Sequence, residues 1–226
     1  MRYFIGNWKM FGLPKSVRII NKINTFVKRD SNKKKYSAII APPFTLLESF
    51  SKSFKNKNIK IGAQNCYHKD LFSSNTGAIS PYMIKSLSTK YVIVGHSDNR
   101  SEGDTDQILK KKVFFALKNN LKIIFCIGEN KTQKKKNQTK RTLKKQITNV
   151  LEKKFNKQNI IVAYEPIWSI GTGKIPSTLE LSDTTKFIKK VLNKIYKNKN
   201  TLPVLYGGSV DSSNIVQFKK LTEIDG

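Results

Sequence analysis

Acidic residues, arginines, cysteines and long apolar runs are all scarce in this 226-residue chain. Its two cysteines, Cys66 and Cys126, exclude a small disulfide-stapled fold and are typical of an intracellular protein with free thiols. No apolar run reaches the roughly 18 residues that a membrane-spanning helix needs. The first ten residues lack the apolar stretch of a signal peptide. We therefore expect a cytoplasmic protein with no membrane partner, folded as one domain over residues 1–226 with a sizeable core.

The shortage of acidic residues leaves a formal net charge of +28, with 43 basic and 15 acidic side chains. Such a charge is compatible with a basic nucleic-acid-binding protein. However, only five of the basic residues are arginine, the side chain that favours bidentate phosphate and guanine recognition. Lysine, asparagine and isoleucine are abundant and share A/T-rich codons, so genome composition explains the mixture. We expect solvated faces at lysine runs 33–35, 110–112 and 134–136, no specific nucleic-acid partner, and faster encounter with small anions.

Short apolar runs rich in β-branched residues alternate with helical patterns along the whole chain. The runs are nearly continuous rather than alternating, which is typical of parallel strands buried on both faces. Spacings of roughly 30 residues match βαβ units and favour a (β/α)8 barrel, with a doubly wound sheet as the alternative. The predicted strands are residues 3–7, 37–41, 59–63, 91–94, 122–127, 160–164 and 202–206, with 223–226 as the start of an eighth. The predicted helices include residues 16–27, 104–117 and 177–196, the last with Ser177 as N-cap of a capping box.

Polar residues gather where these predicted strands end, which is the catalytic face of a barrel. A lone histidine is more often structural than catalytic, and a lone lysine is usually just exposed. The recurrence of such residues at the carboxyl ends of several predicted strands favours a functional role, because the stability of the fold does not require that arrangement. The residues concerned are Asn7, Lys9, Gln64, Asn65, His96, Ser97, Glu129, Glu165 and Gly207 to Ser209.

Two glycine-containing loops follow the last two predicted strands. Residues 170–174 lie between a Pro-Ile-Trp segment and Pro176, an arrangement that suits a lid moving as a unit. Residues 207–209 read Gly-Gly-Ser and let backbone N–H groups approach an anion. Neither loop matches a dinucleotide or Walker motif. Together they fit a phosphate site in a barrel.

Several of these segments form longer motifs in a fixed order from residue 3 to the end of the chain. They read Gly-Asn-Trp-Lys-Met from 6, Gly-Ala-Gln-Asn from 62, Gly-His-Ser from 95, Cys-Ile-Gly-Glu from 126, Ala-Tyr-Glu-Pro-Ile-Trp from 163, Gly-Thr-Gly-Lys from 171 and Tyr-Gly-Gly-Ser-Val from 206. In these motifs and their spacing the chain closely resembles the triosephosphate isomerase family. The resemblance implies a (β/α)8 TIM barrel that interconverts dihydroxyacetone phosphate and glyceraldehyde 3-phosphate in glycolysis and gluconeogenesis.

The resemblance also implies a role for each matching residue. Glu165 is expected to be the base, His96 a neutral electrophile, and Lys9 the cation that stabilises the enediolate and attracts phosphate. Asn7 contacts substrate, and Gly171 of the lid and Ser209 hold the phosphate. No metal or organic cofactor is required. The family forms a homodimer through the long loop from Gln64 to Ile79, with Thr76 near the partner's active site.

Six positions depart from the family pattern, and none is Lys9, His96 or Glu165. They are Phe11, Ala78, Asp98, Asn99, Asp104 and Ser169. Ala78 and Asn99 stand where the family has a Glu and an Arg that pair across the dimer. Most of strand eight and the last helix of the family are absent from this chain, so we favour a fragment. The alternative is a catalytically impaired barrel that has lost backbone donors to the phosphate.

Overall fold

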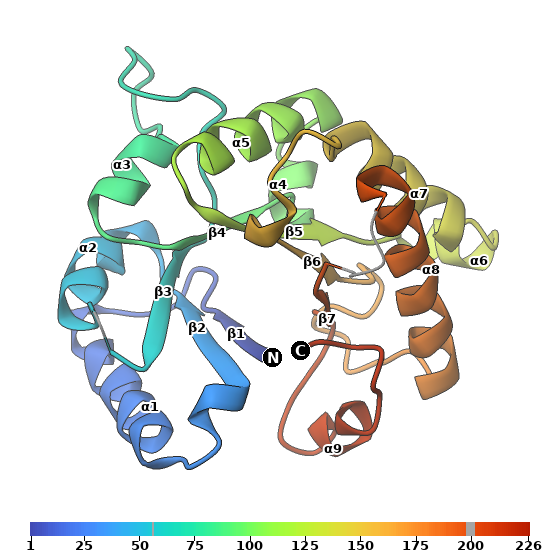
Figure 1. Ribbon diagram of the computed structural model, residues 1–226, viewed down its shortest axis with the longest axis horizontal. Coiled ribbons are helices and arrows are strands. Elements are labelled where there is room, and N and C mark those ends of the chain that lie inside the picture. Colours follow the sequence, from blue (N-terminus) through green and yellow to red (C-terminus); the bar gives the residue numbers. More distant parts are fainter. Residues whose placement is uncertain (56, 198–201) are drawn as a thin grey trace.

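Seven parallel strands in sequence order form one curved sheet that nearly closes into a barrel, with helices around its outside (Figure 1). The computed structural model describes residues 1–55, 57–197 and 202–226. The strands are β1 (Arg2–Asn7), β2 (Tyr36–Ala41), β3 (Ile59–Ala63), β4 (Tyr91–Val94), β5 (Lys122–Ile127), β6 (Ile160–Tyr164) and β7 (Val204–Tyr206). This topology confirms the TIM barrel and excludes the doubly wound sheet, whose strand order would be permuted.

The seven complete predicted strands are all present, and four of them have the predicted limits, whereas residues 223–226 are not assigned as a strand. β1 and β2 each begin one residue earlier than expected. β7 is shorter, because it begins at Val204 rather than at Leu202. Pro203 lies just before it and has no N–H to donate to a ladder. Its carbonyl still accepts a bond from the Val162 N–H at 2.9 Å, so the chain follows β6 before the strand begins.

The C-terminal residues lie between β1 and β7, where both chain ends meet in Figure 1. The Tyr3 N–H donates to the Asp225 carbonyl at 2.8 Å, and the Tyr206 N–H donates to the Gly226 carbonyl at 3.0 Å. The Asp225 N–H returns a bond of 2.9 Å to the Val204 carbonyl. Residues 225 and 226 therefore bridge the two outer strands, as expected for the start of an eighth strand, and these edges are not left wholly unpaired.

The helices follow from apolar stripes and local caps. The described helices are α1 (Val17–Arg29), α2 (Phe44–Ser53), α3 (Pro81–Ser86), α4 (Ser97–Ser101), α5 (Asp106–Lys118), α6 (Lys131–Lys135), α7 (Thr139–Val150), α8 (Thr178–Tyr196) and α9 (Ile215–Lys219), with 3-10 turns at Pro14–Ser16, Lys33–Lys35 and Lys157–Asn159. Ser177 caps α8 by accepting the Glu180 N–H, as predicted, while the Glu180 carboxylate pairs with Lys134. α5 begins two residues later than predicted, because Thr105 is its N-cap.

Two apolar layers hold the barrel together. The larger lies between strands and helices, and the smaller fills the barrel interior. The inner layer takes every second residue of a strand, as Ile39 and Ala41 or Ile124 and Cys126 illustrate. Burial of both strand faces explains the continuous apolar runs in the sequence.

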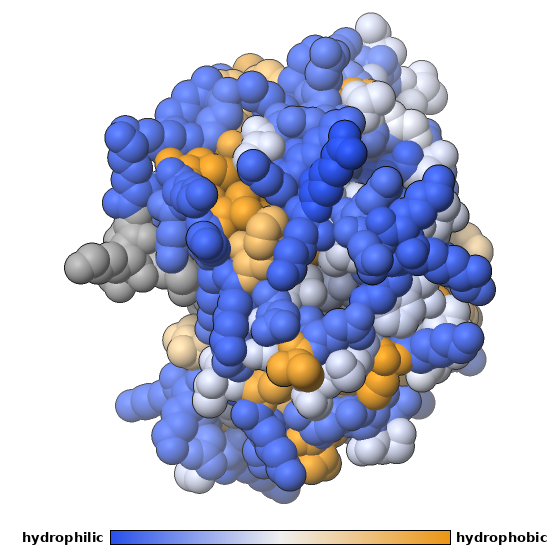
Figure 2. Space-filling model, turned by 90° about the vertical axis from the view of Figure 1, so that its right-hand side faces the viewer, coloured by the Kyte–Doolittle hydropathy of each residue, from blue (hydrophilic) through white to orange (hydrophobic). Residues whose placement is uncertain are grey.

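Hydrophilic side chains cover most of the face over α6 to α8, with only small separate apolar patches (Figure 2). The solvated-face prediction for the lysine run 110–112 is wrong at one position. Lys112 is buried, and its ammonium donates to Asp104 Oδ2 at 2.7 Å and to Asn65 Oδ1 at 3.0 Å. Its position on the inward face of α5, next to an acceptor pair, explains the difference. No helix in the described part of the chain is long and apolar enough to cross a membrane.

Candidate active site

A cavity of about 360 Å³ opens where the strands end at their carboxyl termini. Its floor belongs to the inner apolar layer, so the site is continuous with the barrel interior. Five of the six predicted site residues line it: Asn7, Lys9, His96, Glu165 and Gly171. Ser209 lies between two lining residues, and its hydroxyl donates to the Ser169 carbonyl at 2.7 Å rather than pointing into the cavity. A larger surface hollow near α5 shares no residue with this cavity.

Glu165 follows β6 and is held in a space that only glycines leave open. A Cβ at position 207 would lie 2.6 Å from Glu165 Cγ, and one at position 128 would lie 1.9 Å from the Glu165 carbonyl oxygen. The Glu165 N–H also donates to the Ile127 carbonyl at 2.8 Å. Backbone and side chain are thus fixed from both neighbouring strands.

Burial raises the pKa of the Glu165 carboxyl to about 7, because the charged form loses hydration. The Cys126 thiol and the charge of Lys9 act in the opposite direction. One carboxylate oxygen, Oε1, accepts the Cys126 Sγ–H at 3.3 Å. The other, Oε2, is buried and has no hydrogen-bond partner. A free carboxylate oxygen with a pKa near neutrality is suited to accept a proton.

His96 is the N-cap residue of α4, and this position fixes its tautomer. Its Nδ1 accepts the Asp98 N–H at 3.2 Å, which leaves the ring proton on Nε2. Burial lowers the pKa of His96, the Asp98 carboxylate raises it, and the Lys9 charge lowers it again. A neutral ring with an Nε2–H donor follows from this arrangement.

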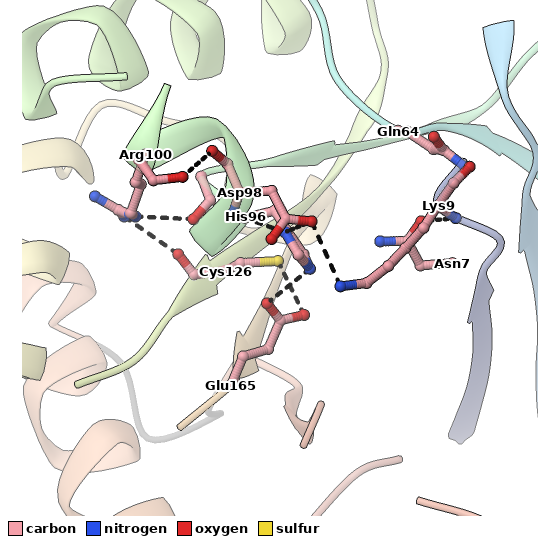
Figure 3. A network of polar contacts seen from close by, with 10 residues as sticks. Asn7, Lys9, Gln64, His96, Asp98, Arg100, Cys126 and Glu165 are labelled. Atoms are coloured by element: carbon pink, nitrogen blue, oxygen red, sulfur yellow. Dashed lines mark hydrogen bonds and ion pairs between the residues drawn. The ribbon is translucent and has the colours of Figure 1, made fainter. Parts of the chain in front are cut away.

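The base and the imidazole lie close together in the cavity lining. His96 Nε2 lies 3.7 Å from Glu165 Oε2, longer than a hydrogen bond but short enough for both to reach one small substrate. Figure 3 shows the Glu165 carboxylate directed at His96 and Cys126, with Lys9 extending from the opposite side.

Lys9 adopts a left-handed backbone with φ of 50°, which is uncommon for a side chain of this size. The Lys9 N–H donates to Asn7 Oδ1 at 3.0 Å, and the Gln64 amide donates to the Lys9 carbonyl at 2.9 Å. The Lys9 ammonium lies 3.4 Å from Asp98 Oδ2, on the cavity side of His96. Asn7 and Gln64 therefore hold the strained turn that aims Lys9 at the site.

Two contributors to the site were not assigned any role from the sequence. Cys126 reaches Glu165 because it is an inward residue of β5, and burial raises the pKa of its thiol. Arg100 donates to the carbonyls of Gly95 at 2.8 Å and Cys126 at 3.2 Å, so it ties the His96 turn to β5. The period-two inner face of β5 is the one sequence signal that points to Cys126.

The predicted lid is anchored at its start by Glu129, which is fully buried. Glu129 accepts the Trp168 indole N–H at 2.8 Å and the Tyr164 hydroxyl at 3.2 Å. Ser169, also fully buried, lies within 3.1 Å of the Tyr206 hydroxyl and donates to the Lys174 carbonyl across the lid. The strand-end carboxylate predicted at 129 thus holds the lid and does not line the cavity.

The described residues contain no group of three or more His, Cys, Asp or Glu side chains placed to hold a metal ion. What the cavity offers is a buried carboxylate, a neutral imidazole, an ammonium and a glycine-rich rim. That set can move a proton on carbon while stabilising charge on an adjacent oxygen.

Known proteins with similar sequences and structures agree with this chemistry. The family model described as triosephosphate isomerase matches residues 2–226. The triosephosphate isomerase of Alkaliphilus oremlandii is 37% identical over 227 residues, covering 98% of this chain and 90% of that protein. The one from Mycoplasma capricolum is 38% identical over 236 residues, covering 100% and 90%. The crystal structure of triosephosphate isomerase from Bartonella henselae has a TM-score of 0.90 and 30% identity, covering 100% of this chain and 90% of that one. With its barrel, its strand-end cavity and these relatives, the chain belongs to the triosephosphate isomerase family.

Proposed function

We propose that this cavity interconverts dihydroxyacetone phosphate and glyceraldehyde 3-phosphate through an enediolate, with Glu165 as the base. The observation that carries the proposal is the unpartnered Glu165 Oε2, which faces the Nε2–H side of His96 at 3.7 Å inside the cavity. A carbon acid needs a positioned base together with charge stabilisation on its carbonyl oxygen. These two groups supply both from neighbouring positions in one cavity.

In the forward direction the Glu165 carboxylate removes a proton from C1 of the ketone. The electron pair forms a C1–C2 double bond, and the C2 oxygen takes negative charge, which the His96 Nε2–H stabilises by hydrogen bonding. Proton exchange between the two oxygens is completed within the site, and the Glu165 acid returns its proton to C2. A glutamate base with a neutral imidazole is the established pairing for this reaction.

Lys9 and the glycine-rich rim are proposed to bind the charged parts of the substrate. The Lys9 ammonium stabilises the enediolate and attracts the phosphate, and Asn7 contacts the substrate as it holds the Lys9 turn. Gly171 on the lid and the backbone at 207–209 hold the phosphate, with Ser209 contributing its N–H. The hydroxyl of Ser209 already bonds to the lid carbonyl of Ser169, so its backbone N–H is the donor to expect at the phosphate.

The lid is proposed to exclude water, because an enediolate phosphate exposed to water eliminates its phosphate. Ile170 and Gly171 already line the cavity, while Glu129 and Ser169 hold the start of the lid in place. Gly171 and Gly173 have φ values of 68° and 70° with nothing near a would-be Cβ. The tip can therefore approach the substrate without displacing neighbouring side chains.

The test is Glu165→Asp in a coupled isomerase assay. Withdrawing the carboxylate by about one bond should lower kcat by about 10²-fold, because misplacement near 1 Å has that cost. Glu165→Gln, which keeps the size and removes the base, should lower kcat further. Near-normal turnover by Glu165→Gln, with the variant folded as judged by thermal unfolding, would remove Glu165 from this role.

We further propose a homodimer formed through the loop from Gln64 to Ile79. The loop is closed at its base by the Tyr67 N–H bond to the Ile79 carbonyl at 2.8 Å. At its tip Leu71 and Phe72 are 56% and 79% exposed, which is a high exposure for apolar side chains. A second copy of this chain would cover them. The cytoplasmic location and the single domain over residues 1–226 remain predictions of the same kind.

A further inference from the structure

A second hollow of about 320 Å³ lies at the opposite end of the barrel, where β3 and β4 begin. Of the ten described residues that line it, five are lysines and none is acidic. The lysines are Lys55, Lys57, Lys60, Lys85 and Lys90, and we call this site the lysine hollow. It shares no residue with the catalytic cavity, so its ligand is a separate question from the isomerase reaction.

The backbone brings these lysines together from four separate segments. Lys60 is the second residue of β3, and the Lys90 N–H donates to the neighbouring Ile61 carbonyl at 3.4 Å. The Lys122 N–H donates to the Lys90 carbonyl at 2.8 Å, which places a sixth lysine at the start of β5. Lys85 comes from the last turn of α3, and residues 55 and 57 come from the connection that follows α2.

Their charges are not neutralised by nearby carboxylates. Among the described residues, none of the five lysines has a carboxylate within ion-pair distance, whereas Lys110, Lys112 and Lys134 each do. Burial and the charges of Lys90 and Lys122 lower the pKa of Lys60. Like charges held together in this way repel one another, and a bound anion relieves that repulsion.

The floor of the lysine hollow is apolar, which strengthens its attraction for an anion. Phe54, Ile59 and Ile61 line it and are buried, so fewer water molecules screen the ammonium groups. Lys85 is partly held in place, because its ammonium donates to the Asn120 carbonyl at 3.3 Å. The site therefore combines a positively charged rim with an apolar floor.

We propose that the lysine hollow binds a small, multiply charged oligophosphate, either free or as the phosphate chain of a nucleotide. Lysine ammonium groups act as mobile point charges, so they select for charge density, whereas the planar guanidinium of arginine selects for bidentate geometry at a single phosphate. Single-stranded nucleic acid fits less well, because it is usually held by exposed aromatic rings on which bases stack. Phe54, the one aromatic side chain among the described residues that line the hollow, is 4% exposed.

The first experiment is calorimetric titration of the full chain with inorganic tripolyphosphate at low salt, repeated with ATP. The variant Lys60→Gln/Lys90→Gln removes two charges from the hollow. The control Lys144→Gln/Lys145→Gln removes two charges from exposed positions on α7, so both variants have the same net charge. Loss of two charge-assisted contacts should weaken tripolyphosphate binding at least about tenfold in the first variant. The control should change it less than about twofold, and kcat of the isomerase should be unchanged in both.

If tripolyphosphate and ATP bind with equal affinity, the phosphate chain is the recognised group. If ATP binds much more tightly, the ligand is a nucleotide. The variant Lys55→Gln/Lys57→Gln alters the same hollow in the connection after α2, so it serves as the test if the changes at Lys60 and Lys90 disturb folding. Equal weakening by the α7 control would overturn the proposal, because the attraction would then be a property of the whole +28 surface. An absence of saturable binding would do so as well. Tighter binding of an oligothymidine, lost in the same hollow variants, would replace the oligophosphate with nucleic acid.

Discussion

Gly207→Ala is a substitution far from Glu165 in sequence that should nevertheless displace the base. A Cβ at this position would lie 2.6 Å from Glu165 Cγ and 3.0 Å from its Oε1. Position 207 is not in the left-handed region, so alanine causes no backbone strain there. The predicted defect therefore comes only from the contact between the new methyl group and the carboxylate.

The size of the defect follows from that contact. An ordinary van der Waals separation begins at 3.4 Å, so Glu165 Cγ must retreat by about 0.8 Å. The Glu165 backbone is held by its N–H bond to the Ile127 carbonyl at 2.8 Å, so the residue does not retreat as a unit. The side chain must rotate instead. A displacement near 1 Å costs roughly 10²-fold in rate, or about 2.7 kcal/mol of activation free energy.

The assay is steady-state isomerase kinetics with thermal unfolding measured in parallel. We expect kcat to fall about 10²-fold while the free energy of unfolding changes by less than about 1 kcal/mol. Gly103→Ala is the control: its φ is 113° and nothing lies within 4 Å of a Cβ there. Backbone strain at 103 should lower stability by about 1–3 kcal/mol and leave kcat of the folded enzyme unchanged. A Gly207→Ala enzyme with kcat within twofold of the parent would refute the assignment of Glu165 as a tightly positioned base.

Three further outcomes are expected. Burial raises the pKa of Glu165 to about 7, so its basic form is lost as the pH falls through that value. We therefore expect kcat/KM to drop about tenfold per pH unit below 7. A flat pH profile down to pH 5 would contradict this expectation. Ser169→Ala removes a buried hydroxyl that bonds to the Lys174 carbonyl and contacts the Tyr206 hydroxyl. It should lower the free energy of unfolding by about 1 kcal/mol and speed amide hydrogen exchange in residues 170–174. Unchanged exchange there would argue against Ser169 as an anchor of the lid. Sedimentation at micromolar concentration should give a dimer that added salt weakens little and that Phe72→Asp dissociates, and a monomeric parent chain would end the dimer proposal.

The barrel was predictable because its strands are buried on both faces. Residues 123–127 form a continuous apolar run, which is expected where helices cover one face of a strand and the barrel interior covers the other. Ser177 was predictable as an N-cap because that signal is local. Lys9, His96 and Glu165 each follow the carboxyl end of a predicted strand, so their meeting in one cavity was also predictable from the sequence.

Contacts between distant segments were not predictable in the same way. The burial of Lys112 depends on Asp104 and Asn65 meeting it in space, which a run of three lysines does not reveal. The bond from the Cys126 thiol to Glu165 depends on the register of β5 against β6, where Cys126 pairs with Ala163. The lysine hollow collects single lysines from four segments, and none of them belongs to a lysine run.

The two hollows suggest how a chain of charge +28 keeps selectivity for a small monophosphate. Lys9 is the one lysine among the described residues that line the catalytic cavity, where His96 and the glycine-rich rim offer hydrogen bonds from fixed positions. A compact substrate with one phosphate can satisfy that set, because its binding depends on shape and orientation as well as charge. A ligand with several charges gains more from the five lysines at the other end of the barrel. The surplus charge then raises the encounter rate of all phosphates, while the polar geometry of each hollow decides which of them stays bound.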